Sequence, residues 1–279
     1  MSHSNSYRTP SLAEQLARRL PSGGVWQKLR RQLRPLFEKW VAADGSLRSV
    51  LPCGEVVVVS PESRHISWNP EEYKAFRAAV RPGDVVLEAG ANVGAYTVLF
   101  GQWVGHAGRV FAFEPDPVAY AGLVRHIQLN GLADRVTPVQ AAIAGESANR
   151  IRLALFESSG ISRLAADREE PGTRIQEVEA VSIDGFCQRH RLSPNVIKID
   201  VEGAELAALC GARATIARTW QPLQLFAEMH PHVWPLLNIV PADIRRECEH
   251  QGLVAERLNG SRDNLWTTEG VCLRLTRRG

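Results

Sequence analysis

The 279-residue chain has few cysteines, and their spacing excludes several kinds of site. Its five cysteines are scattered, odd in number and never fall into C-x-x-C spacing. Zinc ribbons and small disulfide frameworks depend on such closely spaced pairs. Because each cysteine stands in an apolar stretch, we expect buried, reduced thiols and no structural metal.

Long hydrophobic runs are also missing. No apolar run approaches the roughly 18 residues needed to span a membrane, and the opening residues MSHSNSYRTP lack the core of a signal peptide. Hydrophobic residues make up 44% of the chain and charged residues 23%, which is ordinary for a globular protein. We therefore expect a cytoplasmic protein with one large α/β domain and an appendage.

Positive charge is in excess only near the N-terminus. Residues 1–50 carry nine lysines and arginines against three acids, whereas the remainder carries 24 against 27. Since a nucleic-acid-binding domain needs a broad basic surface, nucleic acid is not an expected partner. The basic face belongs to a predicted helix at 25–41. We favour packing of this helix on the main domain; weak contact with an anionic membrane surface is the alternative.

Residues 1–69 predict an extension, followed by the main domain at 70–279. The extension comprises a short helix at 11–20, the helix at 25–41 and a β-hairpin. The hairpin strands are 47–51 and 55–60, separated by Pro-Cys-Gly. Asn69 then fits the N-cap of a helix that begins at Pro70 and runs to about Val80.

The stretch VVLEAGANVGAYTVLF, residues 85–100, organises the main domain. A β-branched run ends at Glu88, passes through a turn at Gly90, Asn92 and Gly94, and re-enters an apolar pattern of helical period. Glycines allow close approach to the backbone, and a helix N-terminus offers unpaired N–H groups. A strand, turn and helix of this kind suit a nucleotide-like ligand.

The glycine spacing argues against a dinucleotide. A G-x-G-x-x-G fingerprint needs glycines at 90, 92 and 95, where Gly90, Asn92 and Ala95 stand. A second strand, in FAFEPDP, ends at Glu114. In dinucleotide-binding sheets, the next parallel strand presents a carboxylate to the ribose roughly 20 residues after the glycine turn. Glu114 lies slightly farther than that from Gly90. Together the two stretches favour adenosine without a pyrophosphate, as in S-adenosylmethionine.

Strands and helices continue to alternate after residue 116, which predicts a mainly parallel sheet with right-handed crossovers. A pair of late strands without a long helix between them predicts an antiparallel hairpin at one edge of the sheet. The expected elements are a helix at 117–130, strands at 135–140, 150–156, 175–181 and 196–200, a helix at 203–216, and strands at 223–228, 253–258 and 271–276. A small-residue turn at 141–145 is expected beside the adenine, with a plain surface turn as an equal alternative.

The segment VIKIDVEGAE, residues 196–205, together with the two stretches above, resembles the FkbM-type family of S-adenosylmethionine-dependent methyltransferases. The likeness includes SSGISRL, VEAVSIDGF and AEMHP, and so covers roughly residues 82–231. It implies a Rossmann-like class I methyltransferase with a seven-stranded, mostly parallel sheet. It also implies methylation of a hydroxyl on a sugar, glycan or secondary metabolite. Substrate choice usually lies outside the matched region.

The resemblance and the strand ends together predict the cofactor site. Glu88 is expected to accept a hydrogen bond from the methionine ammonium, its alternative role being to cap the following helix. Glu114 is expected to bind the ribose hydroxyls, while Asn92 and Thr97 touch the carboxylate end, with an inert helix position as the equal alternative for Thr97. The full set of expected contacts is Glu88, Gly90, Asn92, Gly94, Thr97, Glu114, Pro115, Ala142 and Asp200.

The expected catalytic residues are His230, Asp200 and Glu228. An alcohol loses its proton during attack, so a positioned base is needed. His230 ranks first because histidine titrates near neutrality. Asp200 could instead hold the cofactor ammonium, orient the acceptor or cap a helix. Glu205 is expected to face the protein interior, and His65 and His232 are outside candidates for the base.

Two other functions compete with this interpretation. An NAD-dependent oxidoreductase on the same sheet is disfavoured by Asn92 and Ala95 and by the absence of a Tyr-x-x-x-Lys pair. A catalytically inactive, cofactor-binding scaffold would be favoured by the loss of Glu88, Gly90 or Glu114, and all three are present.

Overall fold

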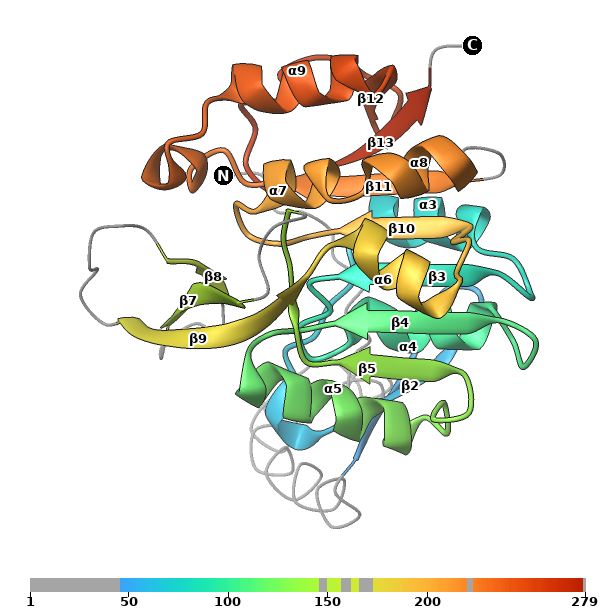
Figure 1. Cartoon of the computed structure of the whole chain (residues 1–279). Helices are drawn as coiled ribbons and strands as arrows, with labels where there is room; N and C mark the ends of the chain where they lie inside the picture. Colours follow the sequence, from blue (N-terminus) through green and yellow to red (C-terminus); the bar gives the residue numbers. More distant parts are fainter. Residues whose placement is uncertain (1–45, 146–149, 157–161, 166–172, 220–222, 278–279) are drawn as a thin grey trace, which may run out of the picture.

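The computed structural model describes residues 46–145, 150–156, 162–165, 173–219 and 223–277. A central β-sheet carries helices on both of its faces (Figure 1). The helices predicted at 11–20 and 25–41 lie outside the described residues, so the domain boundary after residue 69 stays a prediction.

The central sheet has seven strands in the order β12-β13-β11-β10-β3-β4-β5. The five from β11 to β5 pair in parallel, whereas β13 runs antiparallel to β11 and to β12. This confirms the Rossmann-like sheet and the antiparallel hairpin at its edge. The strands are β3 (Val85–Ala89), β4 (Arg109–Phe113), β5 (Val136–Val139), β10 (Val196–Ile199), β11 (Gln224–Met229), β12 (Leu253–Arg257) and β13 (Val271–Arg277).

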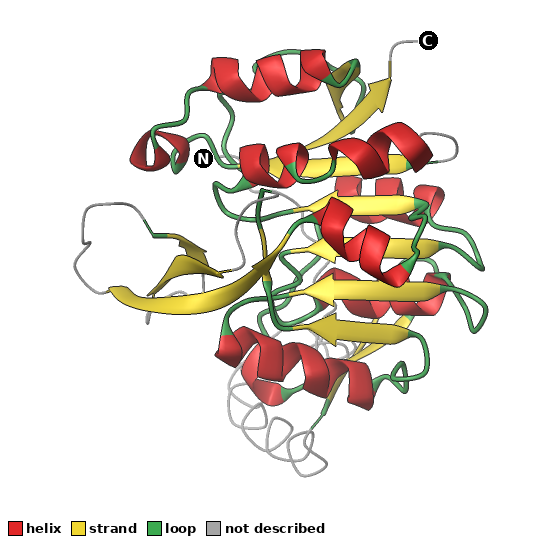
Figure 2. Ribbon diagram, viewed as in Figure 1, coloured by secondary structure: helices red, strands yellow, loops and turns green. Residues whose placement is uncertain are grey.

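Helices cover both faces of this sheet (Figure 2). One face packs against α3 (Pro70–Ala79), α4 (Ala95–Trp103) and α5 (Pro117–Leu129). The other packs against α6 (Ile183–His190), α7 (Glu205–Cys210), α8 (Arg213–Thr219) and α9 (Pro241–His250). Two short 3-10 helices, η1 (Pro61–Ser63) and η2 (Trp234–Leu237), complete the set of described helices.

The strand sequences explain this layering. Val86, Val196 and Phe226 belong to the core on the α3 to α5 face, whereas their neighbours Leu87 and Ile197 belong to the opposite core. Successive side chains of a strand point to opposite faces, and a parallel sheet buried on both faces needs apolar residues at every position. The apolar runs found in the sequence are therefore the inner strands of the sheet.

The helix starts follow from local capping. The side chain of Asn69 accepts hydrogen bonds from the backbone N–H groups of Glu71 and Glu72, with Pro70 at the first helical position. This confirms the predicted N-cap. Asp116 caps α5 in the same way. These side chains satisfy backbone donors that a helix leaves unpaired at its first turn.

Other helix predictions were wrong or missing. The single helix expected at 203–216 is two helices, α7 and α8, separated at Gly211 and Ala212. A Cβ atom on Gly211 would lie 2.5 Å from the backbone oxygen of Ala144, so close packing against residue 144 requires glycine at this break. The sequence analysis also missed α6 and α9, both short helices with polar outer faces.

The β-hairpin of the extension is confirmed as β1 (Leu47–Val50) and β2 (Val56–Val59), paired antiparallel. Val57 and Val59 are buried in the core shared with α4 and α5. The side chain of Asn130 also accepts from the backbone N–H of Val58 and donates to its carbonyl. The described part of the extension thus packs directly on the main domain.

A second, smaller sheet projects beyond the carboxyl ends of the central strands (Figure 1). Its order is β6-β9-β7-β8, formed by β6 (Ala142–Ile143), β7 (Arg150–Phe156), β8 (Ser162–Leu164) and β9 (Thr173–Val181). The turn predicted at 141–145 is therefore partly wrong. Residues 142–143 are extended, because they pair in parallel with the end of β9.

All five cysteines are free, but only Cys187, Cys248 and Cys272 are buried. Cys53 is exposed and Cys210 is partly exposed, so the expected burial was wrong for these two. The apolar residues next to Cys53 in the sequence suggested that it is buried, but Cys53 lies in the exposed turn of the β1–β2 hairpin. In the part of the chain that the structure describes, no helix has the length and apolarity to span a bilayer.

Candidate active site

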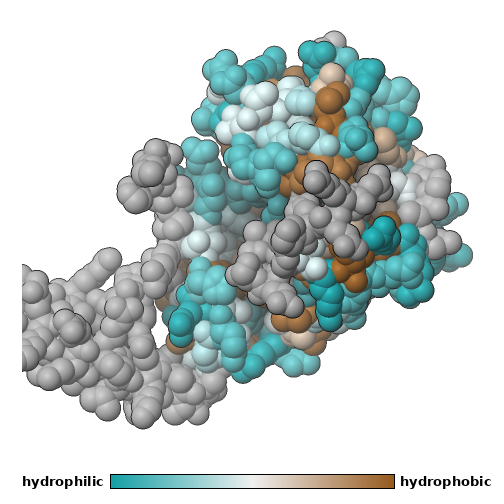
Figure 3. All heavy atoms as spheres, turned by 90° about the vertical axis from the view of Figure 1, so that its left-hand side faces the viewer, coloured by the Kyte–Doolittle hydropathy of each residue, from teal (hydrophilic) through white to brown (hydrophobic). Residues whose placement is uncertain are grey.

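The predicted site residues come together where the parallel strands end. Glu88 and Glu114 lie at the ends of β3 and β4, and Asp200 and His230 directly follow β10 and β11. Strand β3 lies between β4 and β10: the chain runs outward from β3 through β4 to β5 and later returns to form β10 on the other side of β3. Ligands of open α/β sheets bind at such switch points. Figure 3 views this side of the molecule, where hydrophilic surface surrounds smaller hydrophobic patches.

The glycine turn after β3 requires its glycines for packing. Gly90, Asn92 and Gly94 all have left-handed backbone angles, with φ values of 79°, 49° and 90°. A Cβ atom on Gly90 would lie 1.6 Å from the backbone oxygen of Asp200. The sequence predicts that this glycine lets a ligand approach. The close approach in the structure is instead to the loop after β10, which brings the Asp200 segment against the turn.

Glu114 shapes the same turn. Its Oε2 accepts from the backbone N–H of Asn92 at 2.7 Å and its Oε1 from that of Asp116 at 2.8 Å. The residue is 4% exposed, and burial raises its pKa to about 7. Each carboxylate oxygen has a second lone pair, so the proposed contact with ribose is compatible with these bonds.

Glu88 is held from the α4 side. It is 1% exposed and accepts a hydrogen bond from the hydroxyl of Thr97 at 2.6 Å. Burial raises its pKa to about 7. Its alternative role as a helix cap is wrong, since the N-cap of α4 is Gly94 and no side chain caps this helix. Thr97 is fully buried and bonds to Glu88, so the expected direct contact with the cofactor carboxylate is not what this geometry favours.

Lys198 is a site residue that the sequence analysis missed. It lies beside Glu88 in the β10–β3 register and is 3% exposed. Its Nζ is 2.9 Å from Oδ2 of Asp200 and 5.5 Å from the ring centroid of Tyr96. Burial acts to lower the pKa of Lys198, but the charges of Asp200 and Glu88 outweigh it and raise the pKa. A lysine inside the apolar run VIKI was the available signal.

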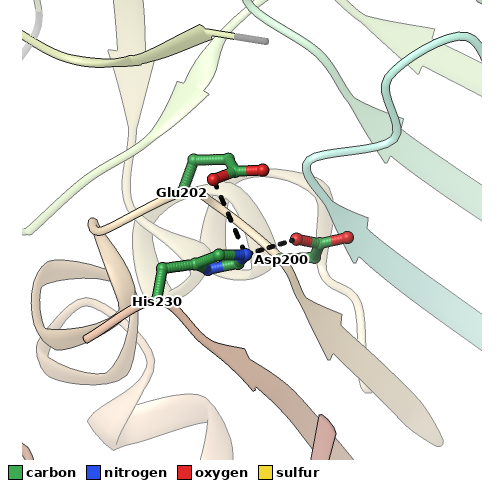
Figure 4. Close-up of side chains that lie close together, drawn as sticks. All are labelled: Asp200, Glu202 and His230. Carbon is green, nitrogen blue, oxygen red and sulfur yellow. Dashed lines mark ion pairs between the residues drawn. The ribbon is translucent and has the colours of Figure 1, made fainter. Parts of the chain in front are cut away.

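His230 lies at the centre of several carboxylates. Its Nδ1 is 2.7 Å from Oε1 of Glu205. Its Nε2 lies 3.6 Å from Oε2 of Glu202 and 3.8 Å from Oδ1 of Asp200, as Figure 4 shows. An oxygen of Glu228 is also 3.8 Å from this nitrogen. The expected catalytic residues therefore form one cluster.

Glu205 holds His230 in place from the buried side of this cluster. It is fully buried and also accepts hydrogen bonds from the indole N–H of Trp234 at 2.6 Å and the backbone N–H of Gly203 at 2.8 Å. The prediction that Glu205 faces the protein interior is confirmed. Trp234, which lies in η2, was not identified from the sequence.

The electrostatics of the cluster change the ranking of the proposed bases. Burial lowers the pKa of His230, but the hydrogen bond that its Nδ1–H donates to Glu205 and the charges of Glu202 and Asp200 outweigh burial and raise the pKa to about 10. Burial, together with the charge of Asp200, raises the pKa of Glu228 to about 9. At neutral pH both groups hold a proton, so neither is poised to accept one.

Four other predicted residues lie outside this cluster. Pro115 is partly exposed between Glu114 and Asp116. Ala142 is 5% exposed and lies in β6. The ring of His232 is 6.5 Å from that of His230, centroid to centroid, and pairs with Glu269. His65 is exposed in the turn after η1.

The residues present fit S-adenosylmethionine by their chemistry. Carboxylates suit both parts of the cofactor that need acceptors: Glu114 the ribose hydroxyls, and Glu88 with Asp200 the ammonium group. The left-handed turn at Gly90 to Gly94 places the N-terminus of α4 beside them. These carboxylates occupy neighbouring strand ends, as an adenosine ligand joined to an amino acid requires.

Comparison with known proteins gives a consistent result. Residues 88–252, more than half of the chain, match the Methyltransferase FkbM domain. The chain is 30% identical over 182 residues to the 31-O-demethyl-FK506 methyltransferase FkbM of Streptomyces tacrolimicus, covering 54% of this chain and 67% of that protein. It is 27% identical over 201 residues to the methyltransferase sdnD of Sordaria araneosa, covering 58% and 74%.

Two further similarities are more partial. The 2-O-methyltransferase NoeI of Sinorhizobium fredii is 28% identical over 154 residues, covering 50% of this chain and 61% of NoeI. The solved structure of the methyltransferase FkbM from Methylobacillus flagellatus KT covers 94% of this chain and 57% of its own, at 19% identity and a TM-score of 0.42. The match to the domain places methyl transfer ahead of the NAD-dependent alternative, and the chain belongs to the FkbM family of methyltransferases.

Proposed function

We propose that this protein transfers the methyl group of S-adenosylmethionine to a hydroxyl oxygen of a sugar, glycan or secondary metabolite. The observation that carries this proposal is the convergence of Glu88, Glu114 and Asp200 at neighbouring strand ends around the glycine turn. The names of two relatives, an O-demethyl-FK506 methyltransferase and a 2-O-methyltransferase, support oxygen as the acceptor atom.

In this proposal the cofactor supplies a methyl group on a sulfonium, and the protein supplies alignment. Fixing donor and acceptor in line is worth about 7–11 kcal/mol in favourable systems. The rigid contacts of Glu114 to the turn and of Thr97 to Glu88 hold the proposed acceptors of the cofactor in place.

The acceptor hydroxyl must lose its proton. His230 and Glu228 hold protons at neutral pH, as their raised pKa values require. We therefore place Asp200 first as proton acceptor, reversing the order expected from the sequence, since its side chain is 27% exposed and its Oδ1 faces His230. His230 then serves as an N–H donor that orients the acceptor oxygen. A positioned base contributes about 10²–10⁴-fold to the rate.

Ligand binding tests the cofactor site first. S-Adenosylhomocysteine at a hundred times its dissociation constant stabilises a folded protein by about 2.7 kcal/mol. We expect a rise in melting temperature with this ligand and none with NAD. Glu114→Gln should remove most of the rise, whereas Glu249→Gln, which changes an exposed acid on α9, should leave it unchanged. A shift with NAD alone would overturn the proposal.

Transfer itself is tested with labelled S-adenosylmethionine and a panel of sugar, glycan and polyketide hydroxyls. We expect label on an oxygen of one acceptor class, with Asp200→Asn reducing the rate by about 10²–10⁴-fold. Binding of S-adenosylhomocysteine without transfer to any acceptor, in the panel or in an extract of the source cells, would favour the inactive-scaffold alternative.

A further inference from the structure

Asp200, Glu202 and His230 bring three potential metal ligands to one point. One oxygen from each carboxylate and a ring nitrogen of His230 all lie within 4.8 Å of one another. The two acids come from the loop after β10 and the histidine from the residue after β11 (Figure 4). The group therefore depends on neighbouring strands that only the fold brings together.

The histidine nitrogen that faces this point has no hydrogen-bond partner among the described residues. His230 is 5% exposed, and its Nδ1 is occupied by Glu205. Its Nε2 points between the carboxylates of Glu202 and Asp200, at 3.6 and 3.8 Å, beyond the range of a hydrogen bond. Nε2 therefore has only these long ion-pair contacts and one more to Oε1 of Glu228 at 3.8 Å, which leaves space for a ligand between the three groups.

The spacing suits a bound cation. Ligand atoms that lie about 2.1 Å from a metal ion, at right angles to each other, are about 3 Å apart. The observed separations from Nε2, 3.6 and 3.8 Å, are slightly longer. Small side-chain movements would therefore bring all three ligand atoms to coordinating distance from one ion. Oδ2 of Asp200 bonds to Lys198, which leaves Oδ1 facing the point where an ion would lie.

Glu205 gives His230 the support found at metal sites. A histidine that binds a metal almost always donates its other ring N–H to a carboxylate or carbonyl, which fixes the tautomer and the ring orientation. Glu205 is fully buried and is itself held by Trp234 and the backbone N–H of Gly203. Nε2 is thereby directed at the carboxylates of Asp200 and Glu202.

We propose that Asp200, Glu202 and His230 bind one divalent cation of the Mn²⁺ or Mg²⁺ class. Carboxylate ligands suit these ions, and the single imidazole favours Mn²⁺ over Mg²⁺. The side chains of Asp200 and Glu202 are 27% and 29% exposed, so coordination positions stay open to solvent. In the ion-bound protein Nε2 of His230 carries no proton, so the ion replaces that N–H in orienting the acceptor oxygen, which occupies one of these positions if the proposed function is correct. The cysteine spacing predicts no structural metal, and this site uses no cysteine.

The test uses Mn²⁺ alone, without cofactor or acceptor. Electron paramagnetic resonance measures free Mn²⁺ during a titration of the 279-residue protein at pH 8, where protons compete less for His230 than at neutral pH. We expect one ion bound per chain, and Glu202→Gln should weaken binding at least tenfold. The control is Glu269→Gln, which breaks the neighbouring ion pair between Glu269 and His232 and should bind Mn²⁺ as the wild type does.

Two results would overturn the inference: no loss of the free Mn²⁺ signal with the wild-type protein, or unchanged affinity in Glu202→Gln. Melting curves recorded without metal show whether each variant folds, and Asp200→Asn provides a second variant. The cofactor test uses S-adenosylhomocysteine without metal. A protein that binds that ligand but not Mn²⁺ refutes the metal site alone, and the converse refutes the proposed cofactor.

Discussion

The carboxylate of Glu205 lies 2.7 Å from Nδ1 of His230, and both side chains are buried beneath the candidate active site. The residues are 25 positions apart, one in α7 and one directly after β11. This pair sets the direction of the ring, because the same carboxylate is fixed by the indole of Trp234.

Removing the carboxylate should destabilise the protein strongly. Breaking one side of a buried ion pair costs about 3–5 kcal/mol, since the other charge stays buried without a partner. We expect that loss for Glu205→Ala in urea denaturation. Trp234→Phe removes one donor to the same carboxylate and should cost about 2 kcal/mol. Equal losses in the two variants would show that Glu205 acts only through the indole.

Lys198 should be coupled to Glu88. These residues are neighbours across β10 and β3, and both are almost fully buried. Lys198→Met leaves Glu88 and Asp200 without their cation, so we expect a loss of about 3–5 kcal/mol. Addition of Glu88→Gln should recover about 1–3 kcal/mol of it, as coupled neighbours do. Urea denaturation of both single variants and the double variant measures this coupling.

A surface lysine provides the control for that cycle. Lys74 is exposed on α3, and Lys74→Met should change the free energy of unfolding by less than about 0.5 kcal/mol. Strict additivity of the Lys198 and Glu88 losses would contradict the proposed electrostatic link.

Gly90 and Gly83 offer a matched pair of substitutions. Both have positive φ, 79° and 92°, but a Cβ on Gly90 would overlap the backbone of Asp200, whereas one on Gly83 would meet nothing within 4 Å. Gly83→Ala should cost about 1–2 kcal/mol, the strain of a left-handed alanine. Gly90→Ala should cost more than about 4 kcal/mol. Soluble yield and urea denaturation compare them, and similar losses would refute the packing argument.

Protonation of His126 should destabilise the fold. Its Nδ1 donates to the backbone oxygen of Val93 at 2.6 Å, and its Nε2 accepts from the backbone N–H of Ser60 at 3.0 Å. Burial lowers its pKa. Below about pH 6.5 the unfolded chain binds a proton that the folded protein excludes, so stability falls as the pH drops, by up to about 1.4 kcal/mol per pH unit.

The variant His126→Gln isolates this effect, because its amide can keep one donor and one acceptor without titrating. The difference in melting temperature between the variant and the wild type should move in favour of the variant from pH 7.5 to pH 5. A constant difference over that range would exclude His126 as the titrating group.

Cofactor affinity should also depend on pH. Burial raises the pKa of Glu88 to about 7, and only its ionised form accepts a hydrogen bond from an ammonium group on both oxygens. The affinity for S-adenosylhomocysteine should therefore rise from pH 6 to pH 8, by less than about tenfold per pH unit. Calorimetric titration of the wild type and Glu88→Gln checks this. A variant with the same affinity and slope would remove Glu88 from the proposed site.

The apolar strands and their acidic ends could be recognised locally. Val85 to Glu88 and the segment ending at Glu114 are short β-branched or aromatic runs that stop at a carboxylate, and Asn69 before Pro70 is a helix start with a known mechanism. Each of these signals consists of residues that lie close together in the sequence. They were sufficient for the parallel sheet, and together with the segment at residues 196–205 for the family.

Short polar elements were harder to predict. Helices α6 and α9 each contain few apolar residues, so although these residues face the sheet at helical spacing, each apolar face is only about two turns long. The break between α7 and α8 depends on Gly211 meeting Ala144, a residue far away in the chain. Cys53 similarly looks buried in sequence but is exposed in a hairpin turn.

The sequence alone determined that this chain forms a doubly wound sheet with carboxylates at its strand ends, because apolar periodicity and turn residues act locally. Only the tertiary structure decided that Lys198 is the buried cation between Glu88 and Asp200. It also decided that Glu205 holds His230, and that the raised pKa of His230 disfavours it as the base. These properties depend on burial and on distances between separate strands, which residue order does not contain.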